Sequence, residues 1–207
     1  MGHKFTEIAF TPNVKAIQQE LGSRAMCADM ETGPDFHGTL GPAEAQFLSA
    51  RDSFYMATVS ETGWPYIQHR GGKPGFVRVL DETTIGFADF LGNRQYMTVG
   101  NLKGNDRVSL FFMDYANRRR LKLLGHARII TGENMDDAAL LESLAIPGYR
   151  ARVERGIIIS VAAFDWNCPQ HIAPRYTVDE VAIASRAMVQ RIADLEAKLS
   201  ALGVSEP

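Results

Sequence analysis

Seven short apolar runs, separated by turn-forming residues, constrain the fold of this chain more than any other feature. Turns such as Glu61-Thr62-Gly63 and Asp81-Glu82-Thr83 join neighbouring runs that are rich in β-branched and aromatic residues. This spacing favours hairpins in an antiparallel meander, and therefore a six- or seven-stranded barrel or sandwich. The predicted strands are Phe54–Ser60, Trp64–Arg70, Phe76–Leu80, Thr84–Asp89, Arg107–Asp114, Arg120–Thr131 and Gly156–Asp165.

Composition narrows the class of protein. The chain has 207 residues, enough for one large domain with a full core, and its formal net charge is only −2. A nearly balanced charge gives no electrostatic reason to expect a nucleic-acid partner. No apolar run approaches the roughly 20 residues that span a bilayer. Cys27 and Cys168 have the spacing of neither a disulfide framework nor a zinc knuckle. We therefore expect a cytoplasmic protein with neither a nucleic-acid nor a membrane partner.

Helical patterns flank the strand-rich segment and predict three parts of the chain. Residues 1–42 form a helical appendage and linker, because Pro12 suits a first helical turn and a stretch rich in Gly, Pro and Asp follows. Residues 43–176 form the barrel domain, which opens with a short helix over Ala43–Arg51. Two further helices are predicted within this domain, over Asn93–Leu102 and Met135–Ala145.

The third part, residues 177–207, is predicted to be a long helix over Val178–Leu202. Its apolar positions recur at alternating spacings of three and four, which is the pattern of a heptad seam. Such a seam requires a facing surface, and both the chain's own barrel and a second copy of the chain suit it. The seam consists of Val178, Val181, Ser185, Met188, Ile192, Leu195 and Leu199.

The segment Phe76–Arg94 carries the clearest chemical signal. A hairpin there ends in Gly92-Asn93-Arg94-Gln95, and a loop rich in N–H donors with one guanidinium is typical of a phosphate-binding corner. Gly71-Gly72-Lys73 is not a Walker motif, since Ile67 replaces the first glycine and Pro74 follows the lysine. No Gly-x-Gly-x-x-Gly follows a strand, so a Rossmann site is unsupported.

From roughly Phe47 to Arg175 the chain resembles the FMN-binding split β-barrel family of pyridoxamine 5'-phosphate oxidase. The resemblance implies a mainly β fold with flanking helices (α+β), built as a six- or seven-stranded antiparallel split β-barrel. It also implies FMN as the cofactor, and a homodimer that binds the flavin at its interface. The expected function is that of an FMN-dependent oxidoreductase.

The resemblance carries over to cofactor-binding positions at the corner and the strand before it. Arg94 and Asn93 stand in the family's Gly-Ser-Arg-Lys run and are expected to bind the FMN phosphate, whereas Gln95 replaces the lysine and removes one positive charge. Ala88 and Asp89 stand where the family carries Tyr-Thr. In the family one strand runs along the flavin, and its counterpart here consists of Lys73, Gly75, Phe76, Val77 and Arg78. Lys73 stands where the family usually has arginine, and Arg78 stands where it has lysine.

Later segments of the chain supply the remaining expected contacts. Arg120 begins a strand whose family counterpart contacts the pyrimidine edge of the flavin, where a cation favours the anionic reduced ring. Trp166 is expected to form an apolar wall from the partner subunit, with Gln170 or Arg175 as the polar contact. Cys168 and His171 are too few to predict a metal site. No catalytic acid or base is assigned.

The family's named reaction does not follow from the resemblance. The helix over Met135–Ala145 lacks the Tyr, Arg, Ser series that clamps the substrate phosphate, and the C-terminal Arg-x-His pair is missing. Asp136 and Asp137 would repel a phosphate group there. We therefore expect a different small organic substrate or an electron carrier. A non-catalytic flavin carrier or sensor, and a barrel that uses deazaflavin or haem, are the alternatives.

Overall fold

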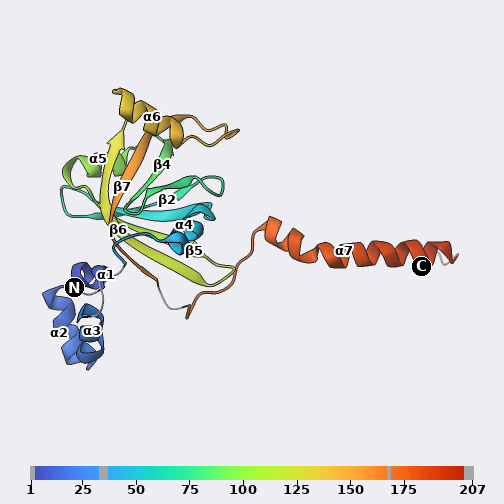
Figure 1. The fold of residues 1–207 in the computed structure, drawn as a ribbon, viewed down its shortest axis with the longest axis horizontal. Helices are drawn as coiled ribbons and strands as arrows, with labels where there is room; N and C mark the ends of the chain where they lie inside the picture. Colours follow the sequence, from blue (N-terminus) through green and yellow to red (C-terminus); the bar gives the residue numbers. More distant parts are fainter. Residues whose placement is uncertain (1–2, 33–36, 167–168, 203–207) are drawn as a thin grey trace. The chain divides into compact units, whose positions relative to one another are not determined.

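The computed structural model describes residues 3–32, 37–166 and 169–202 (Figure 1). The chain forms two compact units. The first contains the described residues of Met1–Asp114 and Arg119–Pro169, and the second those of Tyr115–Arg118 and Gln170–Pro207. The sheet and the first six helices belong to the first unit, and the last helix belongs to the second. The predicted domain boundaries after residues 42 and 176 remain predictions.

Seven antiparallel strands form one sheet in the order β2-β1-β5-β6-β7-β4-β3. The sheet is open, and this confirms the predicted split β-barrel with flanking helices. An ion pair joins Arg70 on the edge strand β2 to Asp89 on β4, the neighbour of the other edge strand β3, so the sheet curls. The strands are β1 Ser53–Val59, β2 Pro65–Gly71, β3 Val77–Asp81, β4 Thr84–Phe90, β5 Arg107–Asp114, β6 Arg119–Ile130 and β7 Val153–Trp166.

The core lies inside the curled sheet, because apolar side chains alternate along its strands. On β5 the buried residues Val108, Leu110 and Phe112 alternate with exposed or half-buried ones, and β6 follows the same period of two. Phe54 lies at the centre of an aromatic cluster, with its ring centroid 4.7 Å from that of Phe112 and 5.2 Å from that of Phe87.

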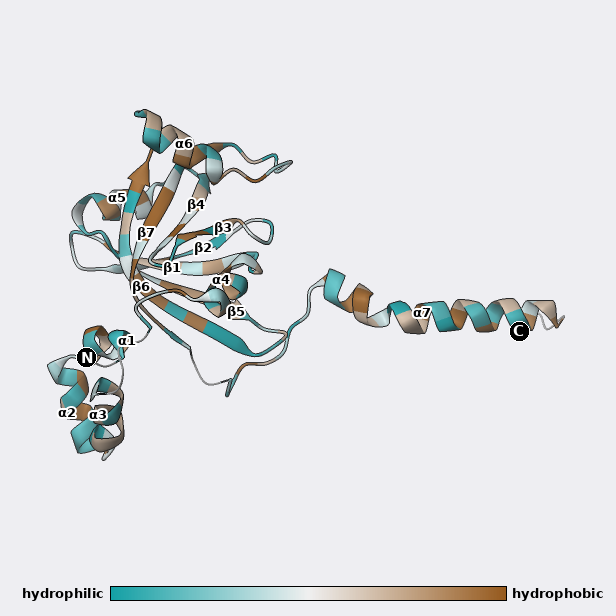
Figure 2. Ribbon diagram, in the orientation of Figure 1, coloured by the Kyte–Doolittle hydropathy of each residue, from teal (hydrophilic) through white to brown (hydrophobic). Residues whose placement is uncertain are grey.

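A second apolar cluster covers the other face of β7. Helix α6, Met135–Ser143, packs Leu140 and Leu141 against Ala88 and Ile158. This cover explains why residues 156–159 of β7 are buried on both faces. Figure 2 shows the resulting hydrophobic colouring of β7.

Three short helices precede the barrel: α1 Lys4–Ala9, α2 Pro12–Glu20 and α3 Arg24–Thr32. On α2, the apolar side chains of Val14 and Ile17 are exposed. Polar contacts join α2 and α3, because Glu31 on α3 accepts a hydrogen bond from Lys15 on α2. Glu31 also accepts one from Arg24 on its own helix. Helix α4, Pro42–Ser49, leads into β1 and buries Phe47 and Leu48, as the sequence predicted.

The two remaining helices differ little from their predicted ranges. Helix α5, Met97–Gly104, begins later than the predicted Asn93–Leu102, because Arg94 and Tyr96 adopt left-handed φ angles of 62° and 55°. Helix α7, Val178–Ala201, begins with a capping box between Thr177 and Glu180. Hydrophilic and hydrophobic segments alternate along its whole length (Figure 2). None of the described helices combines the length and the apolar character that crossing a bilayer requires.

Candidate functional site

A cleft of about 200 Å³ lies beside the loop that follows β4. Both ends of the curled sheet contribute to it, since β2 is an edge strand and β4 pairs with the opposite edge strand. The lining consists of Tyr66, Gln68 and Arg70 on β2, Asp89 and Phe90 on β4, residues 92–99, and Glu154 on β7. The predicted corner residues Asn93, Arg94 and Gln95 all lie in this lining.

The loop at this cleft is held from both sides. Within it, the Asn93 side-chain oxygen accepts a hydrogen bond from the backbone N–H of Gln95 at 3.2 Å. This bond engages one of the backbone amides that the sequence had suggested as phosphate donors. Beyond the loop, α5 is fixed to the sheet, because Thr98 donates to Gln68 on β2 and Asn101 donates to Thr58 on β1, both at 2.9 Å.

Three guanidiniums and two carboxylates form a charge network in and beside the cleft, and of these five groups Arg155 lies outside the lining. Asp89 is buried and is paired with Arg70 and, at 3.6 Å, with Arg155. Glu154 pairs with Arg155 at 2.7 Å and accepts a hydrogen bond from the Tyr96 hydroxyl at 3.2 Å. The third guanidinium, on Arg94, makes no ion pair with a carboxylate among the described residues. The network therefore carries one net positive charge.

Arg94 itself is exposed at the mouth of the cleft. A hydrogen bond to Tyr96, and then the charges of Tyr96 and Glu154, raise the pKa of Arg94 above its ordinary value. The side chain is therefore a permanent cation that projects from a left-handed backbone position. A guanidinium in this state suits a phosphate or carboxylate ligand.

The predicted strand positions lie at the same end of the sheet as the corner. Val77 pairs with Phe87, so the start of β3 lies beside the end of β4. Phe76 and Val77 are buried, as is Ala88, so only their backbone groups are available to a ligand. Because β3 is an edge strand, half of its backbone groups point away from β4. Lys73 is exposed in the preceding turn, and Gly75 there adopts a φ of 84°.

The other predicted residues lie elsewhere. Arg120 and Trp166 belong to the end of the β6–β7 ladder opposite Glu154, about 40 Å away along β7 by strand rise. Trp166 packs edge-on against Phe47 at 4.7 Å, and its indole N–H donates to Glu44 at 2.8 Å. The guanidinium of Arg119 lies 4.5 Å from the Trp166 ring. Within one chain, Trp166 therefore does not line the Arg94 cleft.

Gln170 and Arg175 belong to the second unit. Gln170 is exposed, and the Arg175 guanidinium lies 4.9 Å from the ring of Tyr115 in the same unit. Cys168 lies outside the described residues.

Buried nitrogen atoms without hydrogen-bond partners mark two of the predicted contacts. Among the described residues, the Nε atoms of Arg78 and Arg120 are buried and have no partner, and the same is true of Arg70. An unpaired buried donor is costly, so such positions are candidates for contact with a ligand or a partner chain.

Sequence reasoning missed Arg70, Glu154 and Tyr96. The strand Trp64–Arg70 did hold a usable signal, because Tyr66, Gln68 and Arg70 alternate along one face. No local pattern shows that this face meets the end of β4, since the contact joins opposite ends of the sheet.

Comparison with known proteins identifies the family. The family model described as pyridoxamine 5'-phosphate oxidase matches residues 40–156, which include the whole lining of the cleft. The chain belongs to this family. No curated protein matches the chain.

Several solved structures are similar to this chain at low sequence identity. HupZ from Group A Streptococcus is 20% identical, with a TM-score of 0.51 that covers 66% of this chain and 100% of that one. A variant of the same protein is 19% identical, with a TM-score of 0.50 over 61% of this chain and 98% of that one. An FMN-binding protein from Syntrophomonas wolfei subsp. wolfei is 11% identical, with a TM-score of 0.47 over 75% and 95% of the two chains. The two HupZ structures show the shared fold.

Proposed function

We propose that this chain is an FMN-dependent oxidoreductase that binds the FMN phosphate at the Arg94 corner. The observation that carries the proposal is the exposed Arg94 guanidinium, which makes no ion pair with a described carboxylate and lies at the mouth of the cleft, beside a charge network whose sum, with Arg155 included, is one net positive charge. Membership of the pyridoxamine 5'-phosphate oxidase family supports the choice of a flavin. When bound, FMN supplies two-electron hydride chemistry.

The residues of this chain fit such a cofactor in two respects. Arg94 offers a forked cation to the phosphate, and the outward backbone groups of β3 offer hydrogen bonds to a flat ring edge. The buried Nε of Arg78 on β3 has no hydrogen-bond partner among the described residues and would gain one. The role of these groups is to bind and orient the flavin, and no described residue is assigned a proton transfer.

The active form is proposed to be a homodimer with the flavin at its interface. Ligand pockets usually enclose about 300–1,000 Å³, and the 200 Å³ cleft holds a phosphate but not a flavin ring as well. Arg120 and Trp166 lie at the far end of β7 from this cleft. If they contact the flavin, they do so from the partner subunit. Gln170 and Arg175 follow Trp166 in sequence and are proposed as further contacts from that side.

An apolar outer face of the sheet suits a second copy. Tyr55 pairs with Phe111, and Ala57 pairs with Ile67, so these side chains share the face opposite the core. Tyr55 is 39% exposed and Ile67 is 62% exposed. Neighbouring apolar residues on β2, β1 and β5 are typical of an interface centre.

The proposed substrate is a small organic molecule or another electron carrier. Pyridoxamine 5'-phosphate is proposed to be a poor substrate, because the family's phosphate clamp is absent and the first turn of α6 carries Asp136 and Asp137. Arg128 pairs with Asp137 at 3.1 Å, which leaves Asp136 as the repulsive charge. Pyridoxal phosphate formation at ordinary enzyme rates, about 1–10³ per second, would contradict this account. A cytoplasmic location remains a prediction.

The phosphate assignment is tested by titrating the protein with FMN and with riboflavin, which differ only in the phosphate. We expect Arg94→Ala to weaken FMN binding by about 1.5–3 kcal/mol, or about 10- to 150-fold, because a charge-assisted contact is lost. Riboflavin affinity should hardly change. Arg107→Ala removes an exposed arginine outside the cleft and is the matched control. Equal FMN affinity in wild type and Arg94→Ala would overturn the proposal.

The dimer is tested by sedimentation velocity with and without FMN. Ile67→Glu should convert a dimer to a monomer and abolish tight flavin binding, whereas Met135→Glu, which changes an exposed residue on α6, should do neither. A monomer that still binds FMN tightly would exclude a shared site. An unchanged affinity in a folded Trp166→Ala variant would remove that residue from the site.

Turnover separates an enzyme from a carrier. Flavin-loaded protein should consume a nicotinamide donor in the presence of oxygen, and a carrier or sensor would not. The absorption spectrum of the purified protein distinguishes a flavin from a deazaflavin, and a Soret band would assign haem instead.

A further inference from the structure

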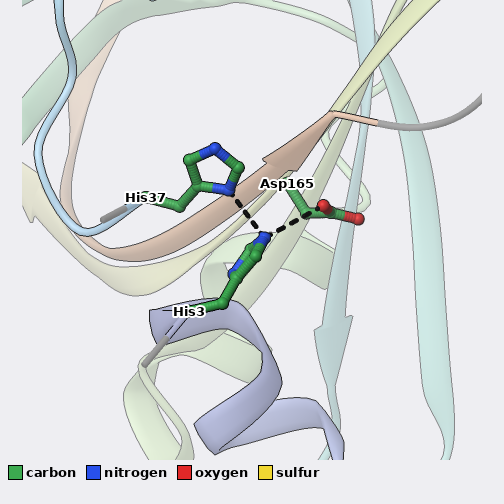
Figure 3. Close-up of side chains that lie close together, drawn as sticks. All are labelled: His3, His37 and Asp165. Atoms are coloured by element: carbon green, nitrogen blue, oxygen red, sulfur yellow. Dashed lines mark hydrogen bonds and ion pairs between the residues drawn. The ribbon is translucent and has the colours of Figure 1, made fainter. Parts of the chain in front are cut away.

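Three side chains from distant segments meet at the end of β7 (Figure 3). His3 caps the start of α1, His37 lies in the segment before α4, and Asp165 precedes the last residue of β7. The Nε2 atom of His3 lies 2.7 Å from Nδ1 of His37 and 3.4 Å from Oδ1 of Asp165. One nitrogen or oxygen atom of each residue lies within 4.8 Å of the others.

These distances are close to those of a metal coordination shell. Zinc binds imidazole nitrogen at about 2.0–2.1 Å and carboxylate oxygen at about 2.0–2.2 Å, so neighbouring ligand atoms lie about 3.0–3.5 Å apart. The His3–Asp165 distance of 3.4 Å falls in this range, and the His3–His37 distance of 2.7 Å is slightly shorter. The third pair, His37 and Asp165, lies within 4.8 Å, so the two rings would rotate to place an ion between the three atoms.

The surrounding structure fixes both imidazoles. His3 is only 4% exposed, and its backbone N–H donates to Met30 at 3.0 Å. His37 adopts a left-handed φ of 65°, which is uncommon for residues other than glycine. Its carbonyl accepts a hydrogen bond from the Phe164 N–H at 2.9 Å, and its ring stacks on the Phe164 ring at 4.8 Å. The sheet therefore holds His37 in a conformation that its own backbone does not favour.

The carboxylate of Asp165 has a second partner that orients it. Lys122 on β6 lies 2.8 Å from Oδ2, while Oδ1 faces His3. The Lys122 ammonium also lies 4.5 Å from the ring of Phe5 on α1. Outer partners of this kind commonly orient carboxylate ligands in metal sites. One oxygen thus remains directed at the two imidazoles.

We propose that His3, His37 and Asp165 bind one divalent transition-metal ion of the zinc type. Imidazole nitrogen with a single carboxylate favours zinc and its neighbours over magnesium or calcium, which prefer all-oxygen shells. Three protein ligands leave the fourth tetrahedral position open for water or another small ligand. The ion would tie α1 and the segment before α4 to the end of β7, next to Trp166. The site differs from the Arg94 cleft, with which it shares no lining residue.

The test uses protein without an affinity tag, treated with a chelator and then titrated with ZnCl₂ in a calorimeter. We expect one zinc ion per chain. His37→Asn removes the imidazole but tolerates the left-handed φ, and it should weaken binding by about 100-fold or more, beyond what the loss of an outer partner costs. His3→Gln should act in the same way. His126→Gln is the matched control, because His126 faces Asp106 at 3.0 Å in an exposed pair without a third ligand.

A second readout separates metal binding from the folding of the variants. Zinc should raise the melting temperature of the wild type and of His126→Gln in a concentration-dependent way, but not that of His37→Asn. If the wild type binds no zinc, or if His37→Asn keeps the wild-type affinity, the proposal is wrong and the three side chains form only a hydrogen-bonded cluster.

Discussion

Asp89→Asn is the most informative single change, because the structure gives this predicted flavin contact a second role in a buried ion-pair network. Its carboxylate lies between the guanidiniums of Arg70 and Arg155, and it joins β4 to the edge strand β2 across the curled sheet. The side chains of Asp89, Arg70 and Arg155 are only 9%, 12% and 14% exposed. Asparagine keeps the shape and removes the charge. We therefore expect a loss of stability together with a more positive cleft.

Removing one partner of a buried ion pair typically costs about 3–5 kcal/mol. Arg70 lines the cleft, where water can solvate its guanidinium, so we expect about 3 kcal/mol, the lower limit of that range. For a chain of this length, each kcal/mol lowers the melting temperature by about 2–4 °C. Asp89→Asn should therefore melt about 6–12 °C below the wild type.

Thermal unfolding by circular dichroism measures this loss, and flavin titration measures the second effect. The cleft network would change from one net positive charge to two, so affinity for FMN should rise relative to that for riboflavin. Asp106→Asn is the control, since Asp106 is 59% exposed beside His126 and such surface pairs contribute at most about 1 kcal/mol. A melting temperature within about 2 °C of wild type would refute the buried pair. Equal losses of FMN and riboflavin affinity would show that Asp89 contacts the flavin directly.

Two further predictions concern packing and pH. Gly125→Ala should lower the free energy of unfolding by about 1–3 kcal/mol in a urea titration, because a Cβ there would lie 2.5 Å from the Ser160 carbonyl oxygen. Gly100→Ala on α5 is the control, because a Cβ there meets open space and should stabilise the helix by up to about 1 kcal/mol. Hydrogen bonds, first of all the one from Lys15, lower the pKa of Glu31 below its ordinary value of 4.5. These bonds therefore stabilise the fold above pH 4.5, and the stabilisation is lost as the pH falls through the lower pKa of Glu31 in the folded state. Glu31→Gln should therefore melt below the wild type at pH 7, and the difference should disappear in acid. An opposite sign for Gly125→Ala, or a pH-independent Glu31→Gln difference, would contradict these explanations.

The strands could be predicted because their signals are local. Short apolar runs and the turn residues between them depend only on neighbours in sequence, and Arg107–Asp114 agrees with its predicted range at both ends. Helix α5 began later than predicted because the left-handed residues Arg94 and Tyr96 give no signal in their side-chain types. Within the predicted helical appendage of residues 1–42, no separate ranges were predicted for α1 and α3. They are short and contact their neighbours through polar pairs such as Lys15–Glu31 rather than through an apolar stripe.

The candidate site was predictable only where it is continuous in sequence. Asn93, Arg94 and Gln95 follow one another in a single loop, and the structure places all three in the cleft. Arg70 and Glu154 enter the same cleft from other strands, so their involvement depends on how the sheet curls. The cluster of His3, His37 and Asp165 was invisible for the same reason, since its ligands come from α1, a connecting segment and the end of β7.

The open sheet also explains why the cleft lies where it does. In a closed barrel, backbone hydrogen bonds would join the two edge strands and leave no outward N–H or C=O groups. Here the Arg70–Asp89 side-chain pair bridges β2 and β4, so β3 remains an edge strand with outward-facing backbone groups beside a polar cleft. One ion pair therefore connects β2 and β4 across the curled sheet and leaves the edge of β3 available to bind a ligand. Weakening that pair should affect stability and ligand affinity together, which is why Asp89→Asn tests the fold and the proposed site in one experiment.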